Sequence, residues 1–339
     1  MATHRSALHT RGFRNTSMFS TLGTDGSRGG DYNAERRAGA RVRECASARA
    51  KCHDDAPSPS PVPLDCESGA ERYSLGILRL VDYPSIPAAM NLAPISPSRP
   101  LRLTDADARP PKSLPRGDEL KAALAAEVDR LRALQSVFYA DGRHALLVVL
   151  QGRDASGKDG VIRSVFSGCN PQGCEVASFK APTETELAHD FLWRVHQEIP
   201  RRGMIGIFNR SHYEDVLVAR VRHLVPRPVW RERYRQINDF ERMLTENRVV
   251  VLKFFLHISK DEQRKQFLER LTDPSKNWKF RAGDLEDRSL WGAYTRAYRD
   301  AIRKCSTSQA PWYVVPSDNN AARNYLVTRV INRALAALN

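Results

Sequence analysis

The sequence predicts an α/β protein with a central parallel sheet of about five strands, covered by helices on both faces. Short apolar runs rich in β-branched residues alternate with longer segments whose apolar residues recur every three or four positions. Strands that alternate with helices form parallel sheets, because each crossover helix packs back against the sheet. A buried strand that runs directly into a glycine-rich loop is a further observation that favours this three-layer fold.

The ordered part of the chain is predicted to begin near Gly117. An amphipathic helix with apolar residues from Leu124 to Phe138 ends near Gly142, where glycine favours a helix end. Strands are then predicted at 144–151, 174–180, 203–209, 249–258 and 311–316. Helices are predicted at 158–167, 184–198, 228–246, 260–272, 289–305 and 320–338.

Residues 1–115 have the composition of a disordered segment. They are rich in Arg, Ser, Gly, Ala and Pro and show no sustained periodicity. The first residues superficially resemble a transit peptide, but no amphipathic helix follows them. We therefore expect residues 1–115 to be disordered or a spurious extension, with Met90 as an alternative start, and residues 116–339 to form the folded domain.

Charge and cysteine content limit the partners and the compartment. The net charge of +14 suits a polyanionic partner, although a basic surface kept for solubility is the alternative. The longest apolar run, Ala145 to Leu150, is far shorter than the roughly 18 residues of a membrane span, so no membrane partner is expected. The six cysteines form no disulfide framework, which indicates a reducing, cytoplasmic location. Cys45, Cys52 and Cys66 match no metal-ligand spacing.

A phosphate-binding loop is the strongest motif. Strand 144–151 leads into Gly152-Arg-Asp-Ala-Ser-Gly-Lys-Asp-Gly160, and a helix is predicted to follow. Gly152, Gly157 and Gly160 let backbone N–H groups approach phosphate oxygens, and Lys158 can reach the terminal phosphates. A flexible loop that matches by chance is the alternative, but the buried strand before it argues against that.

Two acidic residues depart from the usual phosphate loop. Asp159 stands where Ser or Thr normally binds Mg²⁺, so the metal must be held differently. Asp154 lies inside the loop, where a carboxylate would repel phosphate unless Mg²⁺ lies between them. Asp154 is therefore predicted to be a Mg²⁺ ligand or a base rather than a solvated loop residue.

Together with four further motifs, this loop makes the chain resemble the polyphosphate kinase 2 family from about Leu114 to Leu338. The further motifs are Phe179-Lys-Ala-Pro-Thr183, Gly206-Ile-Phe-Asn-Arg-Ser-His-Tyr-Glu-Asp-Val216, Arg270 with Asp273-Pro274 and Trp278-Lys279, and Ala310-Pro-Trp-Tyr-Val-Val315. The resemblance implies a P-loop kinase-like three-layer sandwich, a helical lid around 270–290, and a homo-oligomer, either a dimer or a tetramer. It also implies reversible phosphoryl transfer from polyphosphate to a nucleotide.

The segment after strand 203–209 takes the Walker B position in this resemblance. Many members of the family carry Asp where this chain has Asn209, and Glu214 and Asp215 are nearby acids that could compensate. The segment, which includes Ser211 and Tyr213, is similar to that of the subset that phosphorylates both AMP and ADP. His212 could transfer protons, but a structural hydrogen bond is the favoured interpretation.

Basic side chains are the predicted phosphate ligands. Arg194 to Arg248 contains twelve arginines and no lysine, and guanidinium groups bind phosphate oxygens in pairs, so a polyphosphate track is predicted here, with about half of the arginines paired to acids instead. The predicted track residues are Arg201, Arg202, Arg220 and Arg222. By resemblance, Lys180, Arg210 and Arg270 also contact phosphate, and the role of Asp284 stays open.

These residues predict a magnesium-dependent polyphosphate:nucleotide phosphotransferase. Phosphoryl transfer mainly requires alignment and charge neutralisation, which Lys158, Arg210, Arg270 and Mg²⁺ would supply. ADP, AMP and ATP are the expected nucleotides, with guanine nucleotides also possible partners. An ATP-dependent kinase of a nucleotide or small metabolite is the alternative. Nucleic-acid binding is disfavoured, because the aromatic residues near the arginines lie mainly in predicted helices.

Overall fold

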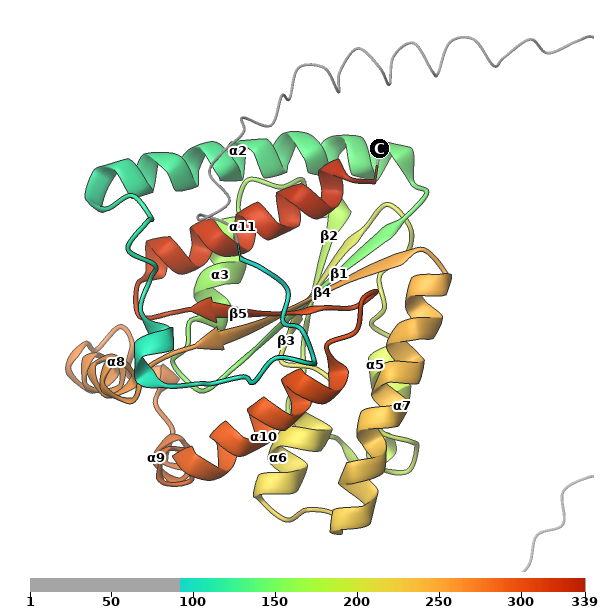
Figure 1. Ribbon diagram of the computed structural model, residues 1–339, viewed down its shortest axis with the longest axis vertical. Coiled ribbons are helices and arrows are strands. Elements are labelled where there is room, and N and C mark those ends of the chain that lie inside the picture. Colours follow the sequence, from blue (N-terminus) through green and yellow to red (C-terminus); the bar gives the residue numbers. More distant parts are fainter. Residues whose placement is uncertain (1–91, 339) are drawn as a thin grey trace, which may run out of the picture. The chain divides into compact units, whose positions relative to one another are not determined.

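The computed structural model describes residues 92–338. Predictions for earlier residues, including disorder up to residue 91, the start at Met90 and the cysteine trio, lie outside this range. Within it, the predicted α/β architecture is confirmed. One sheet of five parallel strands lies between two layers of helices (Figure 1).

The strands lie in the order β2-β3-β1-β4-β5, so the first strand in sequence is central. Their bounds are β1 Ala145–Gly152, β2 Cys174–Ser178, β3 Ile205–Asn209, β4 Val249–His257 and β5 Trp312–Pro316. In β1, Val148 lies opposite Ile207 of β3 and Leu252 of β4. Because the strand order reverses at β1, the carboxyl ends of β1 and β3 open a crevice where ligands bind in such sheets.

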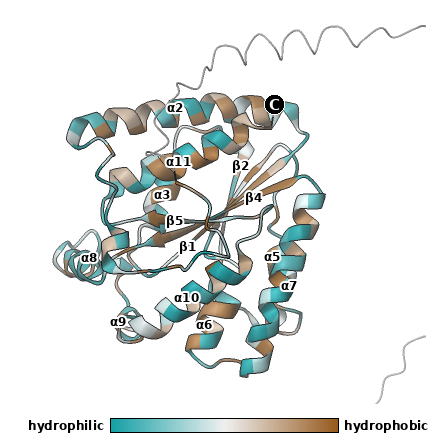
Figure 2. Cartoon of the chain, in the orientation of Figure 1, coloured by the Kyte–Doolittle hydropathy of each residue, from teal (hydrophilic) through white to brown (hydrophobic). Residues whose placement is uncertain are grey.

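Both faces of the sheet are apolar, which explains the continuous apolar runs in the sequence. Every residue of β1 is buried, and β4 is largely brown, the colour of hydrophobic residues, in Figure 2. Leu147 and Val149 of β1 belong to one core cluster, whereas Leu146 and Val148 belong to the other. The two clusters share no residue, because successive side chains of a strand point to opposite faces.

The helices divide between these two faces (Figure 1). One face is covered by α2 Gly117–Asp141, α3 Lys158–Val165 and α11 Asn320–Ala336. The other is covered by α5 Trp193–His196, α6 Glu214–Val221, α7 Arg227–Glu246 and α10 Trp291–Cys305. Beyond the carboxyl end of β4 lie α8 Lys260–Thr272, η4 Asn277–Lys279 and α9 Ala282–Ser289.

One predicted helix is wrong. Instead of a single helix at 184–198, the structure has α4 Glu184–Leu187 and α5, with a turn between them. The Asp190 carboxylate accepts a hydrogen bond from the Leu192 N–H at 2.9 Å, a local bond that competes with the helical pattern. Helices α6 and α9 were not predicted: each is eight residues long, and neither follows a glycine-rich loop of the kind that marks the start of α3, which has the same length.

The structure also corrects the prediction that the whole of 1–115 lacks order, because residues 92–115 pack against the sheet. Leu103, Ala108 and Leu114 are buried, and the Ile95 N–H donates to the Trp312 carbonyl at 2.8 Å. A short 3-10 helix, η2 Asp105–Ala108, lies in this segment, and η3 Pro171–Gly173 precedes β2. The prolines between 94 and 115 shape an extended, packed segment here rather than a disordered one.

None of the helices in the described part of the chain combines the length and apolarity that crossing a membrane would need.

Candidate active site

The phosphate loop joins β1 to α3 at the carboxyl edge of the sheet, as predicted. Gly157 is the N-cap of α3 and has φ +92°, a conformation that favours glycine. A Cβ atom at Gly157 would lie 2.1 Å from Nη1 of Arg323, a residue of α11 that is 3% exposed. Arg323 also donates to the Ser156 carbonyl at 3.4 Å. The loop is therefore held against α11, and the glycine is required by both backbone and space.

Lys158 is buried beneath this loop. Its Nζ donates to the carbonyl oxygens of Gly152 at 2.7 Å and Arg153 at 3.3 Å. Burial, and after it the nearby Arg210 guanidinium, lower the pKa of Lys158 from 10.5 to about 8. A bound polyanion would favour the charged form, so phosphate binding and protonation of Lys158 should be coupled.

Asp154 and Arg210 form an ion pair across the site. Arg210 Nη2 lies 2.9 Å from Asp154 Oδ1, and Arg210 Nη1 lies 3.6 Å from Glu214 Oε2. The Glu214 carboxylate raises the pKa of Arg210, while burial raises the pKa of Glu214 itself. Arg210 adopts φ +65°, which is uncommon for a residue with a side chain. Strained residues of this kind cluster at functional sites, which fits the predicted role in phosphate contact.

Asp159 and Asn209 contact each other directly. Asn209, at the carboxyl end of β3, donates from Nδ2 to Asp159 Oδ1 at 2.7 Å. Asp159 and Asn209, the two residues that differ from the usual Walker motifs, are therefore hydrogen-bonded to each other. Together with Asp154 they line one large cavity. Mg²⁺ binds hard oxygen donors and usually takes only one or two carboxylates together with substrate phosphates. These carboxylate and amide oxygens fit such an ion, and the described residues hold no cluster of three or more His, Cys, Asp or Glu typical of an all-protein site.

A cavity of about 1010 Å³ connects these residues to the segment from α8 to α9. Nine basic and four acidic side chains line it, so it is strongly electropositive. The basic residues are Lys158, Arg163, Lys180, Arg210, Arg270, Lys276, Lys279, Arg281 and Arg323. Gly157 and Gly160 also line this cavity, and Gly152 lines a smaller one beside Asp154 and Arg210.

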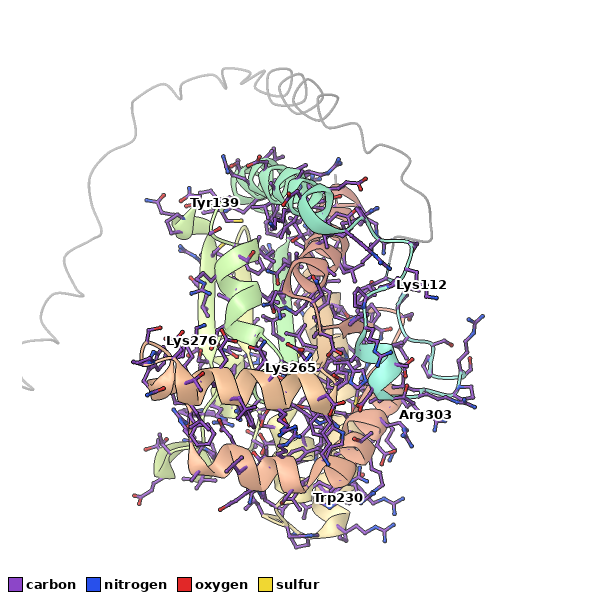
Figure 3. The ribbon with its side chains drawn as sticks, turned by 90° about the vertical axis from the view of Figure 1, so that its left-hand side faces the viewer. Lys112, Tyr139, Trp230, Lys265, Lys276 and Arg303 are labelled. Carbon is purple, nitrogen blue, oxygen red and sulfur yellow. The ribbon has the colours of Figure 1, made fainter. Side chains whose placement is uncertain are left out.

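The far wall of the cavity comes from residues 266–284, which overlap the lid predicted around 270–290. Arg270 of α8 and Asp284 of α9 lie 3.4 Å apart and both line the cavity. Burial raises the pKa of Asp284, and the negative charge of Asp154 across the cavity raises it further. Figure 3 looks onto α8, along which Lys265 is labelled, and Lys276 lies beyond its carboxyl end. Trp278 is 75% exposed although it lines the cavity.

The structure places the predicted arginine track away from the large cavity. Arg201 and Arg202 precede β3, at the amino edge of the sheet, opposite the phosphate loop. Arg220 pairs with Asp300 at 2.7 Å. Arg222 pairs with Asp287 at 2.7 Å and with Glu286 at 3.0 Å. Of the twelve arginines from 194 to 248, only Arg210 lines the large cavity, because composition does not tell which edge of the sheet a residue occupies.

Three residues of the predicted Walker B segment lie outside both cavities. Ser211 is fully buried and accepts a hydrogen bond from Gln151 at 3.1 Å. The Tyr213 hydroxyl donates to buried Glu241 at 2.8 Å. Asp215 pairs with Arg233 at 3.0 Å. His212 Nε2 lies 3.2 Å from Glu241 Oε1, so this histidine makes the structural hydrogen bond that was the favoured interpretation of the sequence.

Sequence reasoning missed other residues of the site. Arg323 and Arg163 were not predicted, because arginine on a helix usually lies on a solvated surface and no motif marks either one. Arg153 is also buried, with its guanidinium 4.0 Å from the ring centroid of Trp291 and 2.5 Å from the Thr295 hydroxyl. Burial lowers the pKa of Arg153 to about 10. Its position inside the loop motif was the only available signal.

The geometry agrees with comparisons to known proteins. The family model "Polyphosphate kinase 2 (PPK2)" matches residues 116–339. The chain belongs to this family. An AMP/ADP-polyphosphate phosphotransferase of Meiothermus ruber is 60% identical over 216 residues, which cover 64% of this chain and 81% of that protein. An ADP-polyphosphate phosphotransferase of Rhodopseudomonas palustris is 48% identical over 227 residues, which cover 63% and 78%.

A solved structure of the same family supports the fold. The crystal structure of polyphosphate kinase 2 from Arthrobacter aurescens TC1 is 40% identical in sequence and superposes with a TM-score of 0.66. The match covers 75% of this chain and 87% of that one. The phosphate loop, the pair Asp159 and Asn209, and the segment 266–284 all lie within the residues that the family model matches.

Proposed function

We propose that this member of the polyphosphate kinase 2 family reversibly transfers phosphoryl groups between inorganic polyphosphate and the nucleotides ADP and AMP. The observation that carries the proposal is the large cavity, in which nine basic side chains extend from the phosphate loop to residues 276–281. A nucleotide kinase needs to neutralise only a few phosphates, whereas this wall can accommodate a longer anionic chain. Relatives named for AMP/ADP and for ADP as acceptors support the choice of nucleotide.

The chemistry follows from charge and placement. Lys158 and Arg210 line the cavity on the loop side and Arg270 lines its opposite wall, where they would contact the terminal phosphates. Because these groups are fixed before the reaction, they can stabilise the charge that spreads over the transferred phosphoryl group. Arg210 is held by Asp154 and Glu214, and we infer that it exchanges part of this pairing for phosphate oxygens on binding.

We propose Mg²⁺ as the metal, held by Asp154 and by the oxygens of Asp159 and Asn209. When bound, it would neutralise charge between the two polyanionic substrates. The Asp154 carboxylate orients the acceptor phosphate, which is already ionised at neutral pH and needs alignment more than deprotonation. We further propose a cytoplasmic homo-oligomer, a dimer or tetramer, which light scattering on the purified protein would test.

The decisive experiment uses purified protein, Mg²⁺ and polyphosphate with no other donor. We expect conversion of ADP to ATP and of AMP to ADP, with GDP tested in parallel, and chelation of Mg²⁺ should stop each reaction. Arg201→Ala, at the far edge of the sheet, is the matched control for Arg270→Ala and should keep full activity. Product formed only with ATP as donor would instead identify an ATP-dependent kinase.

A further inference from the structure

We propose that Gln263 is a positioning residue that fixes Asp154 and connects it to the lid helix α9. This inference deepens the proposed function and rests on it, since Asp154 is the group that would contact metal and substrate. Gln263 belongs to no motif of the sequence, lies outside the phosphate loop, and does not line the large cavity. Its effect on phosphoryl transfer would therefore pass through Asp154.

Both ends of the Gln263 amide are engaged, although the side chain is only 2% exposed. Nε2 donates to the Asp154 carbonyl oxygen at 2.9 Å. Oε1 accepts from Nη1 of Arg288 at 3.0 Å. The opposite amide orientation would place an NH₂ group against a guanidinium and an oxygen against a carbonyl, so the direction of both bonds is fixed. One buried side chain thus links α9 to the phosphate loop.

The loop needs external contacts at this position. Ala155, which follows Asp154, has φ +64°, in the left-handed region. This conformation is unfavourable for a residue with a side chain, so neighbouring contacts must hold it in place. The peptide plane between Asp154 and Ala155 carries the carbonyl that accepts from Gln263. Fixing that plane also fixes the direction in which the Asp154 side chain leaves the backbone.

The other end of the link lies in the lid region. Arg288 is on α9, which also carries Asp284, and its Nη1 donates to the Lys260 carbonyl at 2.8 Å. Asp284 pairs with Arg270 on the wall of the cavity. A shift of α9 that moves Asp284 and Arg270 would therefore also move Arg288 and the acceptor end of Gln263. This arrangement lets the state of the lid bias the geometry of Asp154.

Gln263 also borders the small cavity, together with Asp154, Arg210 and Glu214. The centre of a water molecule can occupy about 30 Å³ of that cavity, which is room for about two water molecules. Gln263 does not line the large cavity, in which we place the polyanionic substrates, and this separates it from the groups that act on the phosphoryl group directly.

The test compares Gln263→Met, which keeps the length of the side chain but removes both hydrogen bonds, with Lys265→Met as the control. Lys265 lies on the same helix with a side chain that is 74% exposed. We expect Gln263→Met to lower kcat about tenfold, the effect of one lost hydrogen bond, and to raise the Mg²⁺ concentration for half-maximal rate severalfold. Lys265→Met should change neither quantity. Arg288→Met should shift the Mg²⁺ dependence in the same direction and by less.

A double-mutant cycle distinguishes positioning from a general packing effect. If Gln263 acts through the Asp154 carboxylate, Gln263→Met should change kcat little in an Asp154→Asn background. Additive losses, or equal losses in Lys265→Met, would overturn the proposal. Should Gln263→Met fail to fold, Gln263→Glu keeps the acceptor for Arg288, removes the donor to Asp154 and adds a negative charge. Arg288→Met, which adds no charge, is therefore carried through the same cycle beside it.

Hydrogen–deuterium exchange supplies a readout that does not depend on activity. Peptides covering residues 152–158 should exchange faster in Gln263→Met than in the unmodified chain, and Lys265→Met should not differ from the unmodified chain. Unchanged exchange in the loop would overturn the positioning role. An unmodified chain that makes no nucleotide from polyphosphate would instead refute the proposed function, and the exchange result would still decide whether Gln263 fixes the loop.

Discussion

Replacing Lys158 by methionine should abolish transfer and at the same time stabilise the fold. Burial lowers the pKa of Lys158 from 10.5 to about 8. One pKa unit corresponds to about 1.4 kcal/mol, so holding this ammonium group in the folded protein costs about 3 kcal/mol. Methionine has a similar length and no charge, so it avoids this cost. It also loses two hydrogen bonds to loop carbonyls, which lowers the free energy of unfolding by about 1–2 kcal/mol. We expect a net gain of about 1–2 kcal/mol in the free energy of unfolding at neutral pH.

The gain should depend on pH in a defined direction. The folded-state pKa of Lys158 lies below its unfolded-state value, so between pH 8 and pH 10.5 the unfolded chain binds a proton that the folded chain has released. The free energy of unfolding contributed by Lys158 therefore rises with pH in that window. The advantage of Lys158→Met should be complete below pH 8 and shrink as the pH approaches 10.5.

Urea unfolding of both proteins, at neutral pH and near the upper end of that window, measures this effect, and polyphosphate-dependent turnover is followed in parallel. Lys265→Met, at an exposed position of α8, is the control and should change neither quantity. A loss of stability greater than about 1 kcal/mol at neutral pH would refute the inferred cost of burial. Normal turnover in Lys158→Met would remove Lys158 from the catalytic site.

Three other changes test separate parts of the site and fold. Asp154→Asn should leave a folded protein whose kcat is about a hundredfold lower, by analogy with the loss of one group that stabilises a transition state; near-normal turnover would exclude that role. Gly157→Ala should weaken polyphosphate binding and lower the Tm, because the added Cβ would lie 2.1 Å from Arg323 and the backbone φ is +92°. Calorimetry with and without polyphosphate measures both effects, and a variant that binds polyphosphate with unchanged affinity would contradict the expected loss of binding. A chain that begins at residue 116 should be several degrees less stable than one that begins at residue 90, since Leu103, Ala108 and Leu114 are buried; equal melting temperatures would show that residues 92–115 contribute no stability.

The sequence predicted those parts of the fold that depend on local patterns. All five strands were found, and the three longest apolar runs, at β1, β4 and β5, are the clearest of them, whereas β2 contains Glu175 and Ser178. The phosphate loop was found because its glycines and Lys158 are close together in sequence. Short helices such as α9 escaped because eight residues contain only about two turns of an apolar pattern.

The parts that were not predicted depend on contacts between distant residues. Nothing in the sequence indicates that Arg323 packs against Gly157, or that Gln263 meets Asp154. The arginine-rich segment supplies only Arg210 to the large cavity for the same reason. Seven of its twelve arginines form ion pairs with acids, some of them far away in the chain. Composition reports how many charges a segment has, whereas binding depends on where the fold places them.

The differing exposure of two tryptophans gives the protein its own optical reporters. Trp278 lies in the segment facing the cavity with 75% of its surface exposed, whereas Trp312 on β5 is 1% exposed. A collisional quencher such as acrylamide should therefore quench the fluorescence of Trp278 and leave that of Trp312 unchanged. Because Trp278 borders the cavity, closure over a bound polyanion would change the quenchable fraction of the emission, and the approach of the lid to its substrate could be followed in real time without any attached dye.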